Sequence, residues 1–419
     1  MSSESDRRNI QMIREYFQAG CKEKHTGAVG MEVEHFVIKK KDQTAVSYYG
    51  PHGVGALLER ISEAFPQKGR SEGQLIALGN DAYVISIEPA AQLEISIVPR
   101  TWLKDIEEIY LQFIDQIHPI LEEWDQCLLT TGYHLTERSE DMELIPKKRY
   151  QFMNRYFEEI GMYGRCMMRG TASVQGSVDY YSEEDFVKTY RAAVAFSPLF
   201  ALLTDNAPIF QKKPWEKHMA RSFIWDRVDP ERCTMVPGTF DDGFGFEAYA
   251  KWVYEVPSIF AEKDGNEDYV GRKSLKDLCK EAVLSEEQLE HGLSIVFPDV
   301  RLKQYVEIRV GDSMPLEYTM SYIALLKGMF WNRDELYKLY KELEQFTPSG
   351  HMTQEDVRQG KDQLITWGYQ GKIYGKPAGF WLERMFRLAG QQLEEEERTY
   401  LQPMQRLVQA GKSVRDRNE

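Results

Sequence analysis

The sequence contains no closely spaced pair of cysteines. Its five cysteines are odd in number, lie far apart, and include no CxxC motif; they are Cys21, Cys127, Cys166, Cys233 and Cys279. Secreted proteins held by disulfides show the opposite pattern, so we expect a reducing compartment and predict a cytoplasmic protein. The eight histidines form no HxxxH or HExxH pair, which argues against a zinc site.

Further absences exclude other classes of protein. The polar stretch MSSESDRRNI does not resemble a signal peptide, and no apolar run approaches the length of a membrane span. We therefore expect no membrane association. Positive charge is not in excess, because 66 Asp and Glu outnumber 52 Lys and Arg to give a net charge of −14. This balance argues against nucleic acid as the main partner.

The common nucleotide-binding motifs are also missing. Gly53-Val54-Gly55 lacks the third glycine of a dinucleotide fingerprint, and Arg406 stands where a P-loop ending at Ser413 needs its first glycine. No internal repeat and no linker rich in Pro, Gly or Ser divides the chain. We predict one domain over residues 1–419, with a sheet-bearing part at about 25–312 and a helical part at about 313–419.

Four stretches alternate polar and apolar residues with the period of a β-strand. In residues 85–98 (ISIEPAAQLEISIV), two strands flank a bend and bring Glu88 close to Glu94. Residues 30–38 (GMEVEHFVI) place Glu32 and Glu34 on one face. Residues 171–180 (TASVQGSVDY) place Gln175 on the polar face of their strand. The fourth stretch, residues 301–310 (RLKQYVEIRV), is expected to be one strand with its charged residues on one face.

These strands predict one antiparallel sheet with a charged face. The alternative is that each polar face is simply solvated. Solvated faces usually mix Lys and Thr, however, whereas Glu dominates three of these strands and Arg the fourth. Helical spacing predicts helices behind the sheet, including residues 102–129 and 182–203, and only helices beyond about residue 314. The expected fold class is α+β.

The charged face also suggests a chemistry. Several carboxylates on one sheet face repel one another, so they raise their own pKa values or bind a divalent cation. Oxygen ligands from Glu and Gln suit Mg²⁺, with Mn²⁺ as a second possibility. Arg309, two residues after Glu307, is placed to neutralise a phosphoryl group. The residues alone thus predict phosphoryl chemistry without naming the substrate.

Seven stretches together resemble the motifs of one enzyme family. They are residues 30–34 (GMEVE), 88–96 (EPAAQLEIS), 146–150 (PKKRY), 167–175 (MMRGTASVQ, expected to be a strand), 221–225 (RSFIW), 240–247 (FDDGFGFE) and 301–309 (RLKQYVEIR). In this order they resemble the glutamate–cysteine ligases (γ-glutamylcysteine synthetases) of the plant-like and bacterial type. That family belongs to the carboxylate–amine ligase superfamily, which is related to glutamine synthetase.

The resemblance implies a glutamine synthetase-like catalytic fold whose sheet holds ATP, metal and glutamate on its concave face. ATP would phosphorylate the γ-carboxylate of glutamate, and the amine of cysteine would displace phosphate to give γ-glutamylcysteine. By position, the resemblance implies metal ligands Glu32, Glu34, Glu88, Glu94 and Glu307, nucleotide contacts Lys303 and Arg309, catalytic roles for Glu307 and Arg309, and substrate contacts Arg221, Gln175 and Arg149.

The chain departs from the family pattern at three places. The Gly-Gly of the bend is Ala90-Ala91, Gly170 stands where the family commonly has an arginine, and Val310-Gly311 replaces a common Gly-Ala. These departures bear on the amine acceptor more than on the use of ATP. The alternatives are a γ-glutamyl ligase for a different amine, a metal-dependent phosphohydrolase, and a nucleotide-binding protein without activity.

Overall fold

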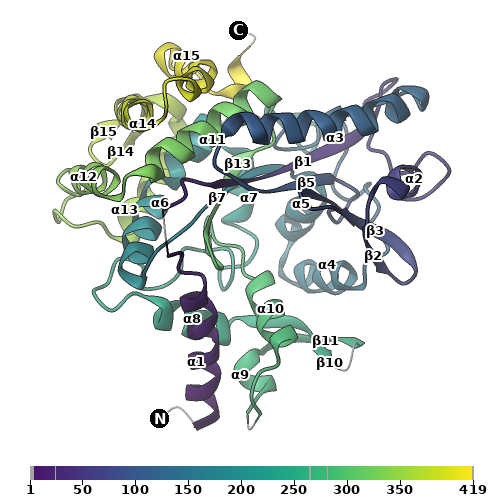
Figure 1. Ribbon diagram of the computed structural model, residues 1–419, viewed down its shortest axis with the longest axis horizontal. Coiled ribbons are helices and arrows are strands. Elements are labelled where there is room, and N and C mark those ends of the chain that lie inside the picture. Colours follow the sequence, from purple (N-terminus) through teal and green to yellow (C-terminus); the bar gives the residue numbers. More distant parts are fainter. Residues whose placement is uncertain (1–3, 24, 264–265, 281, 418–419) are drawn as a thin grey trace.

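A nine-stranded antiparallel sheet forms the centre of the molecule (Figure 1). The computed structural model describes residues 4–23, 25–263, 266–280 and 282–417. The strands follow the order β12–β13–β7–β1–β5–β4–β3–β2, and β6 pairs with β1. Their bounds are β1 Val29–Lys39, β2 Gln67–Ser71, β3 Gln74–Gly79, β4 Tyr83–Ile87, β5 Leu93–Arg100, β6 Gln126–Leu129, β7 Ser173–Val178, β12 Val300–Leu302 and β13 Val306–Asp312.

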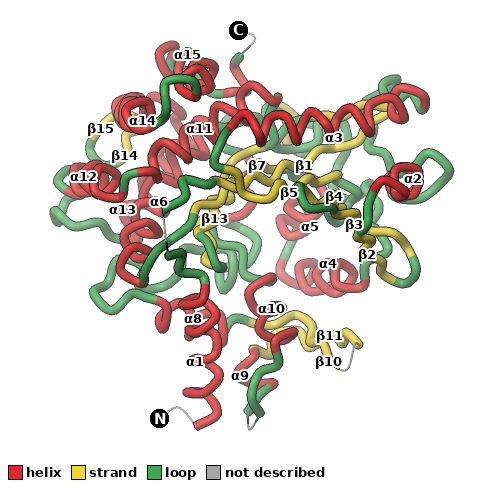
Figure 2. Tube along the Cα trace, in the orientation of Figure 1, coloured by secondary structure: helices red, strands yellow, loops and turns green. Residues whose placement is uncertain are grey.

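Helices cover both faces of this sheet (Figure 2). Their bounds are α1 Glu4–Ala19, α2 Val54–Ile61, α3 Leu103–Glu123, α4 Lys148–Ile160, α5 Met162–Gly170, α6 Glu183–Leu203, α7 Ala220–Trp225, α8 Phe246–Glu255, α9 Leu275–Leu278, α10 Glu286–Ser294, α11 Leu316–Trp331, α12 Arg333–Glu344, α13 Gln354–Trp367, α14 Ala378–Gln392 and α15 Gln402–Ala410. Three small hairpins lie outside the sheet: β8 (Ile209–Phe210) with β9 (Lys213–Pro214), β10 (Pro257–Lys263) with β11 (Asn266–Ser274), and β14 (Lys372–Ile373) with β15 (Lys376–Pro377).

The strand register confirms the predicted α+β fold with one polar sheet face. On β1, Glu34 lies opposite Glu94 of β5, and Glu32 lies opposite Gln175 of β7. The residues between them, such as Val33, are buried on the other side. Alternation along the strand therefore separates a charged face from an apolar one.

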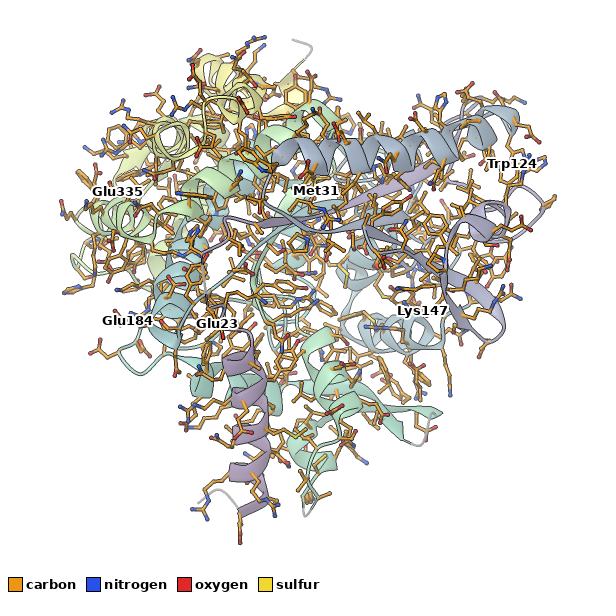
Figure 3. All side chains as sticks on the ribbon, in the orientation of Figure 1. Glu23, Met31, Trp124, Lys147, Glu184 and Glu335 are labelled. Carbon is orange, nitrogen blue, oxygen red and sulfur yellow. The ribbon has the colours of Figure 1, made fainter. Side chains whose placement is uncertain are left out.

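Helices α3 and α11 lie along the apolar face, and α4 and α5 lie on the opposite side of the sheet (Figure 1). Gly176 of β7 permits the close approach of α11, because a Cβ at this position would lie 2.4 Å from a methyl carbon of Leu326. Lys147, just before α4, lies on the side of the sheet away from α3 (Figure 3). The polar face is thus enclosed by the α4–α5 side of the molecule.

The prediction of a single strand over residues 301–310 is wrong. Strand β12 ends at Leu302, β13 begins at Val306, and the hairpin between them places Arg301 opposite Glu307. Both arms of a hairpin keep the period-2 alternation, so the pattern cannot reveal the turn. The turn is set by tertiary contacts, since the hydroxyl of Tyr180 donates to the carbonyl of Lys303 at 3.0 Å.

The prediction of a strand that begins at Met167 is also wrong. Residues 162–170 form α5, and β7 begins only at Ser173. Gly170 and its neighbour Arg169 therefore lie on a helix, where a shift of one position does not move a side chain to the opposite face. A Cβ at Gly170 would lie 2.5 Å from the ring of Tyr133, so this neighbour leaves no room for a side chain.

Other predicted helix boundaries differ less from those in the structure. The helix expected over residues 102–129 ends at Glu123 and is followed by β6, while α6 begins after Ser182, as its capping pattern predicted. The C-terminal part contains the β14–β15 hairpin besides its helices. The division into a sheet-bearing and a helical part of one domain stays a prediction.

Helix α6 corrects the expectation that no stretch reaches the length of a membrane span. It has 21 residues, and an 18-residue window within it has a mean hydropathy of 1.3, so it is long and apolar enough by these two measures. In the structure, 83% of the apolar window is buried inside the protein. This burial is typical of a helix in a protein core.

Candidate functional site

A cavity of about 300 Å³ opens on the polar face of the sheet. Its charged lining comprises four carboxylates (Glu32, Glu34, Glu88, Glu94) and six cationic side chains (Lys147, Arg149, Arg221, Arg301, Lys303, Arg309). A larger groove of about 630 Å³ near Trp215 is lined by exposed charged residues and aromatic rings. Convergent, partly buried groups of both charges mark the smaller cavity as the functional site.

One side of the cavity is an acidic wall formed by Glu32, Glu34, Glu88 and Glu94. The hydroxyl of Tyr150 on α4 donates to Glu88 at 3.1 Å, and Ser86 and Ser96 donate to Glu94 at 2.8 and 3.2 Å. These neutral donors stabilise the carboxylates only in part. No Lys, Arg or His forms an ion pair with the acidic wall in the part of the chain that the structure describes.

The pKa values of Glu32, Glu34 and Glu94 in the acidic wall are raised. Burial, together with the neighbouring Glu88, raises the pKa of Glu34 to about 7. Burial and the other three carboxylates raise the pKa of Glu94 well above its usual value, and burial and Glu307 raise that of Glu32. A bound cation would remove this mutual repulsion.

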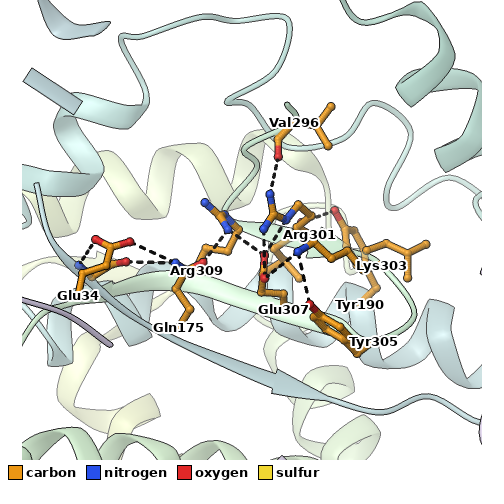
Figure 4. A network of polar contacts seen from close by, with 12 residues as sticks. Glu34, Gln175, Tyr190, Val296, Arg301, Lys303, Tyr305, Glu307 and Arg309 are labelled. Atoms are coloured by element: carbon orange, nitrogen blue, oxygen red, sulfur yellow. Dashed lines mark hydrogen bonds and ion pairs between the residues drawn. The ribbon is translucent and has the colours of Figure 1, made fainter. Parts of the chain in front are cut away.

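The other side of the cavity is a basic wall, formed by Arg301, Lys303 and Arg309 around the buried Glu307 (Figure 4). Arg301 donates to both oxygens of Glu307 at 2.7 and 3.2 Å, and Arg309 donates at 2.8 Å. The ammonium of Lys303 lies 3.8 Å away. Burial alone would raise the pKa of Glu307, but the charges of these three cations hold it well below its usual value.

Gln175 connects the two walls (Figure 4). Its side-chain oxygen accepts from Arg309 at 2.6 Å, and its amide nitrogen donates to Glu34 at 3.4 Å. Glu34 also accepts from the backbone N–H of Ser173 at 2.8 Å. This chain of contacts fixes the guanidinium of Arg309 at the boundary between the acidic and the basic wall.

Two further arginines reach the cavity from helices outside the sheet. Arg221 on α7 is only 4% exposed, and one terminal nitrogen donates to the carbonyl of Arg309 at 2.9 Å. Its Nε has no partner among the described residues. Arg149 on α4 donates to the hydroxyl of Ser294 at 3.4 Å, and its Nε also lacks a partner there. Buried donors without partners are suited to an anionic ligand.

The donor set of the acidic wall fits a hard cation such as Mg²⁺. Among the described residues, no three Asp, Glu, His or Cys side chains lie close enough together to enclose a metal ion by themselves. Mg²⁺ does not require such a cage, because it commonly binds one or two carboxylates and completes its shell with water and substrate phosphates. Burial and mutual repulsion raise the pKa values of Glu34 and Glu94, and a bound cation would lower them.

Nine of the ten residues that the sequence assigned to a site line this one cavity. Glu307 differs from the others because it lies behind the cavity and is bound by cations on the same sheet. Sequence reasoning left out Arg301, Tyr150 and Lys147. The last two lie in the PKKRY stretch, so the basic and aromatic character of that helix start was a usable signal.

The bend between β4 and β5 lies at the floor of the cavity. Gln92 accepts from the backbone N–H of Ala90 at 2.8 Å and donates to the carbonyl of Thr171 at 3.0 Å. Ala91 adopts a φ of 65°, a conformation in which glycine is favoured. The alanines that replace the usual Gly-Gly are therefore accommodated with one strained residue next to Glu88.

Comparisons with known proteins show the family to which the sequence is similar. The model of glutamate-cysteine ligase family 2 matches residues 28–418. Chloroplastic glutamate–cysteine ligases of Brassica juncea and Arabidopsis thaliana are 31% and 32% identical over 342 residues. These matches cover 80% of this chain but only 66% and 65% of the two plant proteins, so the chain spans slightly less than two thirds of their length.

A solved structure shares the fold. The crystal structure of a glutamate–cysteine ligase from Francisella tularensis in complex with AMP superimposes with a TM-score of 0.62. The superposition covers 93% of this chain and 83% of the other, at 12% sequence identity. The open antiparallel sheet with its surrounding helices is thus an architecture found in a solved protein.

Proposed function

Because the chain belongs to glutamate-cysteine ligase family 2, we propose that it joins the γ-carboxylate of glutamate to the amine of L-cysteine with consumption of ATP. The observation that carries the proposal is the cavity whose lining joins an acidic and a basic wall on one face of the sheet. A ligase of this kind must hold phosphates, a metal ion and two amino acids together. The product would be γ-glutamylcysteine, the first intermediate of glutathione synthesis.

The proposed reaction has two steps. An oxygen of the glutamate γ-carboxylate attacks the γ-phosphorus of ATP, the bond to the bridging oxygen breaks, and ADP leaves. The amine nitrogen of cysteine then attacks the acyl carbon, the bond from that carbon to the phosphate breaks, and inorganic phosphate leaves with loss of a proton from the nitrogen. Both steps transfer negative charge, which fixed cations stabilise.

The basic wall is the proposed site of the phosphates. Arg309 and Lys303 would contact the nucleotide, and Arg309 would stabilise the transferred phosphoryl group because Gln175 and Glu307 already hold its guanidinium. The Francisella ligase with its bound AMP lends support to nucleotide binding by this fold. The role of Glu307 that its contacts support is to position Arg309. The metal role predicted for Glu307 stays a prediction, since it requires one of these ion pairs to open.

The acidic wall is the proposed site of the metal. Glu32, Glu34, Glu88 and Glu94 would bind Mg²⁺, or Mn²⁺ in its place, with the phosphates completing the shell. When bound, the metal would neutralise the carboxylates and polarise the phosphate oxygens. Burial and mutual repulsion favour the protonated forms of Glu34 and Glu94. A cation that enters the site would favour the loss of these protons.

The substrate contacts remain as the sequence assigned them. Arg221, whose Nε has no partner among the residues that the structure describes, is proposed for the α-carboxylate of glutamate, and Arg149 and Gln175 for other polar groups of the substrates. A reducing compartment such as the cytoplasm is proposed as well, and the finding that all five cysteines are free fits this location. The two plant relatives are described as chloroplastic.

The test is the release of ADP by the purified chain with ATP, Mg²⁺ and glutamate, with and without a panel of amino acids. We expect release to require glutamate and to be stimulated most strongly by cysteine, with γ-glutamylcysteine identified by mass. Stronger stimulation by another amine would identify a different γ-glutamyl ligase. Equal ATP consumption without any amino acid would instead favour a phosphohydrolase, and no consumption at all would favour a binding protein.

A further inference from the structure

Helix α13 of the C-terminal part reaches the wall of the cavity through a buried lysine. The side chain of Lys361 is 8% exposed, and its ammonium donates to Asp226 at 2.6 Å and to Asp299 at 2.8 Å. An ammonium buried in this way is retained only when opposite charges surround it. The two carboxylates belong to segments that are 73 positions apart in the sequence, since 299 − 226 = 73.

Both segments lead directly to cavity residues. Asp226 follows the last residue of α7, the helix that carries Arg221. Asp299 precedes β12, and its carbonyl accepts from the backbone N–H of Arg309 at 3.0 Å. Lys361 therefore joins the segment of Arg221 to the segment that pairs with the backbone of Arg309.

A second contact ties the other end of α7 to the same helix. The backbone N–H of His218, just before α7, donates to the carbonyl of Ile365 on α13 at 2.9 Å. Helix α7 has only six residues, and a helix of this length is not stable on its own. Its position therefore depends on these attachments to α13 at its two ends and on its packing.

We propose that Lys361 is a positioning residue that holds α7 so that Arg221 points into the cavity. In the proposed reaction, on which this inference rests, Arg221 binds the α-carboxylate of glutamate. Removal of the ammonium leaves Asp226 and Asp299 as neighbouring like charges, which repel each other and separate α7 from the segment before β12. Arg309 is affected less, because Gln175 and Glu307 hold its guanidinium independently of α13.

The experiment compares two variants that each remove one buried ammonium. Lys361→Met breaks the contacts with Asp226 and Asp299, whereas the control Lys327→Met breaks a buried ion pair with Glu397 elsewhere in the C-terminal part. We expect Lys361→Met to raise the KM for glutamate about tenfold or more, because small displacements of a binding group cost this much. The KM for ATP should change by less than about twofold, and Lys361→Arg should restore much of the loss.

The proposal is overturned if Lys361→Met leaves the KM for glutamate unchanged, if it raises both KM values alike, or if Lys327→Met has the same effect. If Lys361→Met fails to fold, Asp226→Asn takes its place. We expect a smaller rise in the KM for glutamate in this variant, and an unchanged KM would overturn the proposal. If the wild-type protein shows no glutamate-dependent release of ADP, the proposed function is refuted instead.

Amide hydrogen exchange tests the same contact without any substrate. We expect residues 220–228 to exchange faster in Lys361→Met than in wild type, and to be unchanged in Lys327→Met. This result would support the positioning role even if the proposed reaction proved wrong. Equal exchange in wild type and Lys361→Met would overturn it even if the reaction proved right.

Discussion

The acidic and basic walls of the cavity both contain glutamates on the same sheet face, but the pKa values of these glutamates shift in opposite directions. Glu307 is surrounded by three cations, and their charges hold its pKa well below the usual value. Glu34 and Glu94 lie opposite each other on β1 and β5, and their pKa values are raised. Glu307 is therefore compensated by cations of the same wall, whereas no Lys, Arg or His among the described residues forms an ion pair with the acidic wall.

Glu307→Gln should produce the largest effect, because it removes the anion that keeps the basic wall together. Arg301, Lys303 and Arg309 would then repel one another, and we expect the free energy of unfolding to fall by about 3–5 kcal/mol. Turnover should fall by about a hundredfold or more, since Arg309 loses its support. Chemical denaturation and ADP release measure the two effects. Unchanged stability would show that the cations do not depend on Glu307.

Glu94→Gln makes the matched change in the acidic wall and should act in the opposite direction. The amide keeps the size of the side chain but removes a carboxyl group that is costly to bury beside other carboxylates, so the metal-free protein should become more stable by about 2 kcal/mol at neutral pH. The rise in melting temperature on addition of Mg²⁺ and ATP should become smaller than in wild type. A lower melting temperature of the metal-free variant would contradict this interpretation.

The pH dependence of stability sharpens the contrast further. The pKa of Glu34 is raised from 4.5 to about 7, so the folded state binds more protons than the unfolded state between these values. This contribution to stability is fully present below about pH 4.5 and is lost as the pH rises through about 7, by roughly 3 kcal/mol. Melting of wild type and Glu34→Gln at pH 5 and pH 8 measures the difference. The variant should lose less stability over this interval, and an equal loss would refute the assignment.

Ala91→Gly should produce the smallest effect. Ala91 has a φ of 65°, so glycine would relieve strain at the bend beside Glu88 and stabilise the protein by about 0.5–1 kcal/mol. Thermal melting checks the change, and Ala90→Gly is the matched control, since Ala90 is not among the residues with positive φ. Destabilisation of the Ala91 variant would show that the alanine side chain contributes more through packing than it costs through strain.

The sequence predicted the strands that carry the polar face, but it predicted neither β2, β3 and β6 nor the state of the charges. Alternation placed Glu32, Glu34 and Glu94 on one face, because a strand has only two faces and the apolar residues must occupy the buried one. The hairpin at residues 303–305 was missed, since both of its arms continue the same alternation. As a result, the bidentate contact of Arg301 with Glu307 was not foreseen.

The positioning of the helices was beyond the reach of local patterns. Lys361 is one of many lysines in charged, helical sequence, and nothing near it indicates that its partners are Asp226 and Asp299. Burial of a charge depends on elements that come together only in the folded chain. The strand at Met167 was expected from the resemblance to a family motif, although Met and Arg favour a helix, which is what the structure has there.

The central place of β1 in the sheet also determines the order in which a growing chain can fold. Its partners β5, β6 and β7 end at residues 100, 129 and 178, so the edge of β1 that pairs with β7 stays open until more than 170 residues have been synthesised. Open strand edges pair readily with other chains. A nascent chain that stalls on the ribosome before β7 therefore has an unpaired strand edge next to Glu32. Rapid translation of residues 100–178 shortens the period in which this edge can pair with neighbouring chains.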